Sequence, residues 1–260
     1  MSTPEAQFES NGPIAFLTFN RPETRNALTW AMYDALVQAC ERVDADESIR
    51  VFVVRASGDA FAAGTDIRQF TGFASGDDGI AYERRLDAVI DRLERVTVAT
   101  IAQVHGVAAG GGCAIALTCD LRVCTPAARF GVPIARKLGN CLSAANLARL
   151  IDLVGPARTK DLLFTGRLLD VAEAASLGLV TAVAEPADID EKVRELAQTI
   201  AGNAPLTVRA TKEVVRRIVV SRRLEARAAD DIIAACYASQ DFREGVAAFL
   251  DKRRPRFTGR

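Results

Sequence analysis

Two kinds of hydrophobic pattern alternate along the first part of the chain. Short apolar runs that end at glycine, proline or serine predict buried strands over residues 14–22, 49–57 and 97–108. Apolar residues at helical spacing predict helices over residues 26–46 and 81–96, between these strands. Because strand, turn and helix alternate, we expect an α/β core in which the strands pair in parallel.

The strand pattern disappears from about residue 188 onwards, and helical patterns replace it. They extend over residues 188–205, 206–220 and 224–255. This change predicts an α/β core over residues 1–195 and a helical C-terminal region over residues 196–260. A glycine-rich and charged stretch, GFASGDDG at residues 72–79, is expected to be a mobile loop.

The composition is that of an ordinary globular protein with no preference for a charged partner. Of the 260 residues, 33 are basic and 33 are acidic, so neither a nucleic acid nor an anionic membrane is indicated as a partner. No run of 18 apolar residues predicts a membrane span, and the first ten residues lack the pattern of a signal peptide. The six cysteines form no CxxC pair and lie in apolar surroundings, which predicts reduced thiols, no metal site and a cytoplasmic location.

Three consecutive glycines, Gly110 to Gly112, lie where a predicted strand passes into a helix, in the stretch VHGVAAGGGCAIALTCD. The first turn of a helix has unpaired N–H groups and a partial positive charge, and glycines let a ligand oxygen reach them. A second glycine turn, FAAGTD at residues 61–66, also follows a predicted strand. Two such turns suit an oxyanion hole, in which N–H groups stabilise negative charge that develops on an oxygen.

Two further roles for the glycines are compatible with the same pattern. The glycines could serve only the close packing of a helix against a strand, or they could bind a phosphate. A P-loop needs a lysine followed by serine or threonine, and a dinucleotide fingerprint needs a different glycine spacing. The stretch GVAAGGG has neither feature.

Several motifs, in this order, resemble the crotonase superfamily, the enoyl-CoA hydratase and isomerase family, almost from end to end of the chain. They are NRPETRNAL (20–28), DAFAAGTDI (59–67), VHGVAAGGGCAIALTCDLRV (104–123), ARFGVP (128–133), FTGRLLDVAEAASLGLV (164–180) and REGVAAFLDKRRPRF (243–257). The resemblance implies a spiral of repeated ββα units and a C-terminal helical region used in trimer assembly. It also implies a homotrimer, or a homohexamer built as a dimer of trimers.

The same resemblance implies a coenzyme A thioester as the ligand. Its carbonyl oxygen would accept hydrogen bonds from the backbone N–H groups of Thr65 and Gly111. The family usually has alanine where this chain has Thr65, and only the N–H of that residue is required. No permanently bound cofactor is expected, because coenzyme A enters as part of the substrate. The contacts that carry over for coenzyme A are Arg25, Ala27, Leu28, Ala63, Asp66, Ile67, Phe249 and Lys252.

The chain departs from the family at the two positions where hydratases carry glutamates. These positions hold Ala114 and Ile134, and neither side chain can activate a water for addition to a double bond. Close to the second position, Arg136 can bind negative charge and Asn140 can orient a water or a substrate carboxylate. Neither of these side chains is a base, so the usual hydration mechanism does not carry over.

The sequence therefore leaves three functions open. The first is an enzyme of the enoyl-CoA hydratase or isomerase type that stabilises a thioester enolate. Among reactions of this type, decarboxylation fits best, because departing carbon dioxide generates the enolate without a protein base. Arg136 or Asn140 could hold the carboxylate. The second is an acyl-CoA-binding paralogue that has lost catalysis. The third is a scaffold subunit whose glycine turns only permit packing.

Overall fold

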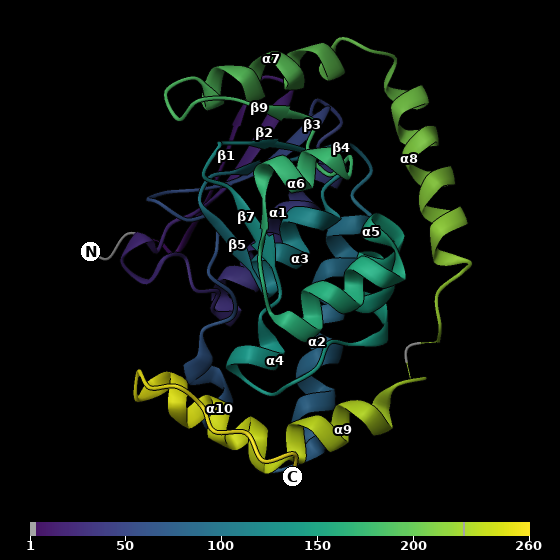
Figure 1. Ribbon diagram of the computed structural model, residues 1–260. Coiled ribbons are helices and arrows are strands. Elements are labelled where there is room, and N and C mark those ends of the chain that lie inside the picture. The colour runs from purple at the N-terminus through teal and green to yellow at the C-terminus, as the bar shows by residue number, and fades with distance from the viewer. Residues whose placement is uncertain (1–3, 226) are drawn as a thin grey trace.

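The computed structural model describes residues 4–225 and 227–260 and is centred on a six-stranded sheet (Figure 1). The first three residues of the predicted core and Ala226, within the helical pattern predicted over residues 224–255, lie outside the described residues. All neighbouring strands pair parallel except the first two, in agreement with the alternating pattern. The strand order is β1 (Ala6–Asn11), β2 (Ile14–Phe19), β3 (Val51–Ala56), β4 (Ala99–Val104), β6 (Leu121–Cys124) and β9 (Ala182–Val183).

β1 is a strand that the hydrophobic pattern did not predict. Its sequence, AQFESN, is mostly polar, and its residues are exposed or half-buried. It pairs antiparallel with β2 through a tight turn in which Gly12 has a φ of 57°. The two-residue loop Gly12-Pro13 has glycine at its first position, where a tight hairpin turn needs a positive φ, so the turn chemistry rather than the hydrophobic pattern identifies this strand.

A smaller three-stranded sheet supports the second glycine segment. It consists of β5 (Val107–Ala109), β7 (Arg129–Gly131) and β8 (Leu169–Asp170). β5 pairs parallel with β7, and β7 pairs antiparallel with β8. The N–H of Gly110 donates to the carbonyl of Gly131 at 3.0 Å, so the glycine turn is attached to the end of β7.

The helices surround the two sheets. Within the described ranges, none of them combines the length and the apolar character that a membrane crossing needs. They are η1 (Pro22–Thr24), α1 (Trp30–Ala45), η2 (Ile67–Phe70), α2 (Gly76–Glu94), α3 (Gly111–Thr118), α4 (Ile134–Lys137), α5 (Ala144–Thr165), α6 (Val171–Ser176), α7 (Ile189–Ala201), α8 (Pro205–Val220), α9 (Asp230–Ala238) and α10 (Gln240–Leu250).

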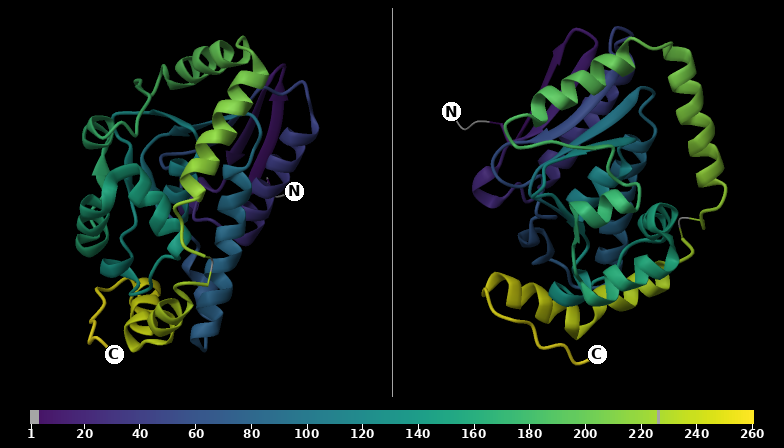
Figure 2. Two further views of the ribbon diagram at one scale, coloured as in Figure 1. Left: turned by 90° about the vertical axis from the view of Figure 1, so that its right-hand side faces the viewer. Right: turned by 45° about the horizontal axis from the view of Figure 1, so that its top comes forward.

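Both faces of the inner strands of the large sheet are buried, which explains why β2, β3 and β4 read as nearly continuous apolar runs. One face packs against α1 and α2, and the other packs against α7 (Figure 2). Val53 in β3 faces α7, whereas its neighbours Phe52 and Val54 face the opposite layer. In α7 the buried Ile189 and Val193 stand at helical spacing against this second face.

α2 begins at Gly76, so the prediction of a mobile loop over residues 72–79 is wrong for its second half. The Asp78 carboxylate accepts hydrogen bonds from the N–H groups of Ala74 and Ser75, both at 2.8 Å. This cap satisfies groups at the helix start and outweighs the low helical propensity of glycine. Gly79 also serves packing, since a Cβ at this position would lie 2.2 Å from the ring of Tyr237.

The last helices reach around the core to its opposite end. α8 runs along one side, and α9 and α10 lie at the far end from α7 (Figures 1 and 2). α10 packs on η2 through the rings of Phe70 and Phe242, whose centroids are 5.8 Å apart. The helical pattern predicted over residues 224–255 is two helices rather than one. Ser239 separates them, because its side chain accepts the N–H of Phe242 and caps α10.

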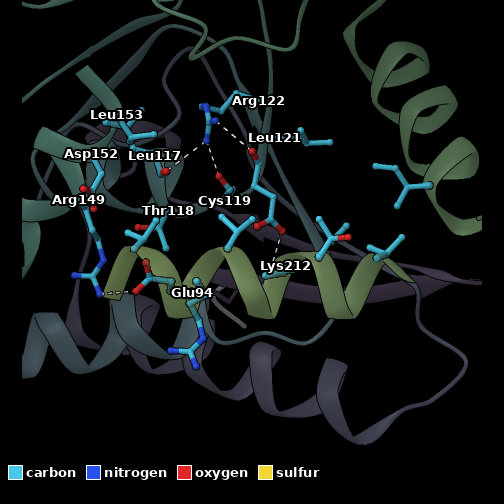
Figure 3. Close-up of a pocket in the computed structure, with 18 of the residues that line it drawn as sticks. Glu94, Leu117, Thr118, Cys119, Leu121, Arg122, Arg149, Asp152, Leu153 and Lys212 are labelled. Atoms are coloured by element: carbon cyan, nitrogen blue, oxygen red, sulfur yellow. Dashed lines mark hydrogen bonds and ion pairs between the residues drawn. The ribbon is translucent and has the colours of Figure 1, made fainter. Parts of the chain in front are cut away.

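A buried arginine holds the C-terminal end of α3 (Figure 3). Arg122 donates through Nη1 to the carbonyl oxygens of Ala116 at 3.3 Å and Cys119 at 2.5 Å. Its Nη2 donates to the carbonyl of Asp120 at 3.3 Å, and its Nε donates to the carbonyl of Leu179. Since a helix leaves its last carbonyls unpaired and carries partial negative charge there, a cation with several donors satisfies this end.

Candidate functional site

Three chain segments meet beside α3 and carry most of the predicted site. The N–H of Leu28 donates to the carbonyl of Gly64 at 2.7 Å, which attaches the opening segment to the first glycine turn, residues 61–66. The N–H of Ala109, the last residue of β5, donates to the carbonyl of Ala62 at 2.9 Å. This bond joins the first glycine turn to the second glycine turn, residues 109–112.

The two glycine turns lie directly against each other. A Cβ built on Gly110 would lie 3.5 Å from the Cα of Gly64, and one built on Gly111 would lie 3.4 Å from Oγ1 of Thr65. Gly110 and Gly64 have φ angles of 51° and 118°, which side chains rarely tolerate. The glycines therefore provide both the shape of the turns and their close approach.

The two N–H groups predicted to bind the ligand oxygen have no backbone acceptor. Gly111 is the first residue of α3, so its N–H belongs to the unpaired first turn. Over residues 4–225 and 227–260, neither this N–H nor that of Thr65 donates to a backbone carbonyl. Two neighbouring free donors at the positive end of a helix suit an oxygen whose negative charge grows during a reaction.

Two tyrosine hydroxyls, which the sequence analysis did not identify, lie next to Thr65. Thr65 Oγ1 is 2.9 Å from the hydroxyl of Tyr33 in α1 and 2.7 Å from that of Tyr82 in α2. Burial raises the pKa of both tyrosines above the usual value, so both phenols stay protonated. In sequence, each tyrosine lies on the apolar face of its helix and is indistinguishable from a core residue.

Most of the predicted coenzyme A contacts lie together at the first glycine turn. The N–H of Ala63 donates to the carbonyl of Arg25 at 3.0 Å, and Ala27 and Leu28 follow in the same segment. Arg25 and Ala63 are exposed, whereas Leu28 and Ile67 are buried. The two exposed residues can therefore contact a ligand with their side chains, and the buried ones fix the backbone.

Asp66, also a predicted coenzyme A contact, is a fixed ion-pair partner. Its carboxylate lies 2.6 Å from Nη2 of Arg68 and 3.4 Å from Nη1 of Arg21. The hydrogen bond from Arg68 is the largest influence on Asp66 and lowers its pKa below the usual value. The side chain is thus an anion that also caps η2, and it is not available as a base.

The last two predicted coenzyme A contacts lie far along the chain, at the C-terminal end of α10. Phe249 is 52% exposed, and Lys252, just beyond the helix, is exposed as well. In the part of the chain that the structure describes, no side-chain hydrogen bond or ion pair holds Lys252. Both side chains are therefore free to reach a ligand that extends past the end of α10.

Ala114 and Ile134, at the positions where the resemblance implies glutamates, lie at the edge of a small cavity and at the start of α4. Ala114, in the first turns of α3, lines a cavity of about 30 Å³ together with Gly110 and Val132. A space of this size holds one or two water molecules or a short alkyl group. No carboxylate is among the residues that line it. Ile134, the first residue of α4, is half-buried against the core.

Arg136 and Asn140 lie in different surroundings although they are close in sequence. Arg136 is exposed on α4, and its side chain lies beside Gly166 at the end of α5. Asn140 donates through Nδ2 to the hydroxyl of Tyr237 at 3.0 Å, and its Oδ1 is buried without a partner in the described part of the chain. The structure therefore leaves Asn140 with one free acceptor and ties it to α9.

A buried carboxyl group, Glu83 in α2, is the partner of this tyrosine and was missed in the sequence analysis. The hydroxyl of Tyr237 donates to Glu83 Oε1 at 2.6 Å, and the N–H of Ser143 donates to Oε2 at 3.0 Å. Glu83 is 2% exposed, and burial raises its pKa to about 7. A glutamate on the apolar stripe of a helix, in line with Leu86 and Ile90, is the signal that could have revealed it.

The raised pKa of Glu83 makes the stability of the fold depend on pH. The folded protein keeps the proton up to about pH 7, whereas the unfolded chain releases it near pH 4.5. The free energy of unfolding therefore falls by about 3 kcal/mol as pH rises through this window, and most of this loss should disappear in Glu83→Gln. Urea unfolding at pH 5 and pH 8 measures this loss of stability. Glu195→Gln, which replaces an exposed glutamate, is the control. Identical pH dependence in wild type and Glu83→Gln would contradict the assignment.

A larger groove, of about 840 Å³, lies between α8 and the core at the other end of α3 (Figure 3). Its walls are mainly apolar, and its charged side chains are held by ion pairs or hydrogen bonds. Lys212 lies 2.7 Å from Asp120, and Arg149 lies 3.0 Å from Glu94. The groove therefore presents apolar surface rather than free charge to a molecule that binds there.

Comparison with known proteins agrees with this architecture. The family model for enoyl-CoA hydratase/isomerase matches residues 9–260. The chain is 36% identical over 263 residues to an enoyl-CoA hydratase of Mycobacterium tuberculosis, covering 100% of this chain and 98% of the relative. It is 31% identical over 252 residues to a short-chain-enoyl-CoA hydratase of Clostridium acetobutylicum, covering 95% and 94%.

A solved structure of methylmalonyl-CoA decarboxylase in complex with 2-nitronate-propionyl-CoA superposes with a TM-score of 0.91. The identity is 25%, and the match covers 100% of both chains. The fold is thus the crotonase-type α/β fold with a helical C-terminal region that the motifs predicted. The chain belongs to the enoyl-CoA hydratase/isomerase family of the crotonase superfamily.

Proposed function

We propose that the protein binds an acyl-CoA thioester and stabilises its enolate through the backbone N–H groups of Thr65 and Gly111. The observation that carries the proposal is the pair of neighbouring N–H groups without backbone acceptors, one of them at the positive end of α3. An enolate concentrates negative charge on the former carbonyl oxygen, so these donors bind it more strongly than the starting thioester.

Hydration of a double bond by the usual route is disfavoured at this site. It needs carboxyl groups that position a water and move its proton, and such acid–base catalysis contributes about 10²- to 10⁴-fold in rate. Ala114 and Ile134 occupy the positions where hydratases carry those groups. The nearby carboxylates described above are engaged elsewhere, because Asp66 pairs with two arginines and Glu83 holds Tyr237.

Decarboxylation of a malonyl-type thioester is the reaction that this arrangement supports best. The bond between the α-carbon and the carboxylate breaks, its electron pair becomes the enolate, and carbon dioxide leaves. A proton from water then completes the product at the α-carbon. Arg136 and Asn140 are the candidates that orient the departing carboxylate, Asn140 through the second N–H of its Nδ2, since their segment follows β7, to which the second glycine turn is bonded. The similarity to methylmalonyl-CoA decarboxylase supports the same choice.

The proposal is tested by incubation in D₂O with malonyl-, methylmalonyl-, crotonyl- and propionyl-CoA, followed by mass spectrometry. We expect loss of carbon dioxide from a malonyl-type thioester with one deuterium in the product, and little exchange of α-protons in propionyl-CoA, because no side chain described at the site can act as the base that removes them. Hydration of crotonyl-CoA should be at least about 100-fold slower, because both glutamates are missing. Rapid hydration would contradict the proposal. Binding without any reaction would favour a non-catalytic acyl-CoA carrier.

We further propose that the chain assembles as a homotrimer or a dimer of trimers. α8 contributes no buried residue, and it exposes Leu206 at 75%, Val214 at 55% and Ile218 at 50%. Apolar surface of this kind is typical of a subunit interface. The six free thiols fit a reducing compartment, and we propose the cytoplasm.

A further inference from the structure

The three hydroxyls at the first glycine turn form a short chain with Thr65 in the middle. Tyr33 approaches it from α1 and Tyr82 from α2, at 2.9 and 2.7 Å from Oγ1. Three protons are available for these two hydrogen bonds, because each hydroxyl carries one. One proton therefore has no acceptor within the cluster.

Burial decides which proton is left over. Tyr33 is fully buried and Tyr82 is 7% exposed, and in the described chain Thr65 Oγ1 is the single acceptor within hydrogen-bond distance of either phenol. A buried O–H without an acceptor is costly, so both phenols donate to Thr65, whose oxygen can accept two hydrogen bonds. The proton of Thr65 is then free, and Thr65 is the least buried member of the cluster.

The free proton lies at the proposed oxyanion hole. A Cβ on Gly111 would be 2.1 Å from the hydroxyl of Tyr33 and 3.4 Å from Oγ1 of Thr65, so the cluster touches the first residue of α3. Two phenols that donate to one hydroxyl also polarise it and make it a stronger donor. Because both phenols have raised pKa values, this pattern persists across the physiological pH range.

We propose that the side-chain hydroxyl of Thr65 donates a third hydrogen bond to the thioester oxygen, next to the N–H groups of Thr65 and Gly111. The identity of the ligand rests on the proposed function. The inference gives Thr65 a catalytic role through its side chain, whereas the family resemblance requires only its N–H. Tyr33 and Tyr82 are positioning residues, since they act by fixing the direction of the Thr65 proton.

The test compares Thr65→Val, which keeps the shape and the N–H, with Thr65→Ser, which keeps the hydroxyl. Infrared difference spectra of bound propionyl-CoA, labelled with ¹³C at its carbonyl, report the hydrogen bonds to that oxygen. Because Thr65→Val leaves two phenols without an acceptor, the triple variant Y33F/T65V/Y82F removes these orphan groups and guards against a folding defect. The rate of carbon dioxide loss from the malonyl-type thioester is measured in parallel.

We expect a lowered carbonyl frequency in wild type and Thr65→Ser, and a smaller lowering in Thr65→Val and the triple variant. Loss of carbon dioxide should be slower by about 10- to 100-fold in the variants without the hydroxyl, because one hydrogen bond to a charged oxygen is lost. An unchanged frequency in Thr65→Val, or no bound thioester in wild type, would overturn the inference. If wild type lowers the frequency but releases no carbon dioxide from any malonyl-type thioester, the proposed catalysis fails while the third hydrogen bond stands.

Discussion

Replacing Gly111 by alanine should lower the rate of decarboxylation of a malonyl-type thioester by about 100- to 1,000-fold, which is the effect of losing one oxyanion-hole donor. The added Cβ would lie 2.1 Å from the hydroxyl of Tyr33, a distance that no carbon atom tolerates. Either the first turn of α3 or the tyrosine has to move. Movement of that turn changes the direction of the Gly111 N–H, and the donor no longer meets the thioester oxygen.

The clash involves a single removable atom, which allows a rescue experiment. In the double variant Gly111→Ala/Tyr33→Phe the nearest tyrosine-ring carbon is 3.3 Å from the new Cβ, so a shift of a few tenths of an ångström suffices. We expect the double variant to recover part of the lost decarboxylation rate. Gly112→Ala should not be rescued in this way, because its Cβ would meet the backbone oxygen of Ala62 at 2.6 Å.

Gly202→Ala is the matched control, since its Cβ would make only ordinary contacts of 3.5 Å or more. Decarboxylation rates by mass spectrometry and melting temperatures are measured for the whole set. A Gly111→Ala protein with the wild-type rate would show that the N–H of Gly111 does not contact the reacting oxygen. A slow double variant with a normal melting temperature would show that the hydroxyl of Tyr33 is needed for more than space.

Local patterns in the sequence predict those parts of the structure that are determined by residues close together in the chain. Parallel strands buried on both faces leave nearly continuous apolar runs, and glycine turns follow two of them. The turn at Gly64 and the turn at Gly110 each need a positive φ, so their glycines are visible in sequence. The start of α2 was missed because two glycines conceal a cap formed by Asp78.

Contacts between distant residues were not predictable, because a tyrosine or a glutamate on a helix looks the same whatever it meets. Thr65 is 32 residues from Tyr33 and 17 residues from Tyr82, and the hydroxyl cluster exists only after α1 and α2 pack. Glu83 and Tyr237 are 154 residues apart. The sequence thus reveals which backbone groups are free, and packing alone reveals which side chains support them.

Replacing Arg122 by methionine should lower the free energy of unfolding by about 3 to 5 kcal/mol. The guanidinium, 6% exposed, donates to carbonyl oxygens of Ala116, Cys119, Asp120 and Leu179. Methionine fills similar space but donates nothing, and each buried carbonyl that loses its donor costs about 1 to 3 kcal/mol. Loss of the positive charge at the end of α3 adds to this cost.

Urea unfolding measures the effect against two other variants. Arg122→Lys keeps the charge but loses the planar set of donors, so its loss should be intermediate. Arg194→Met, on the exposed face of α7, should stay within about 0.5 kcal/mol of wild type. A loss below about 1 kcal/mol in Arg122→Met, comparable to an ordinary surface substitution, would contradict the role of this arginine as the cap of α3.

The same substitution also tests whether the fold and the site are coupled through α3. This eight-residue helix has Arg122 bonded at its C-terminal end and the free N–H of Gly111 at its N-terminal end. If the arginine holds the helix in place, Arg122→Met should weaken the binding of propionyl-CoA in buffer without urea, where the variant is still folded. Calorimetry measures this affinity. A wild-type affinity in a destabilised variant would show that α3 keeps its position without the cap and that the arginine serves stability alone.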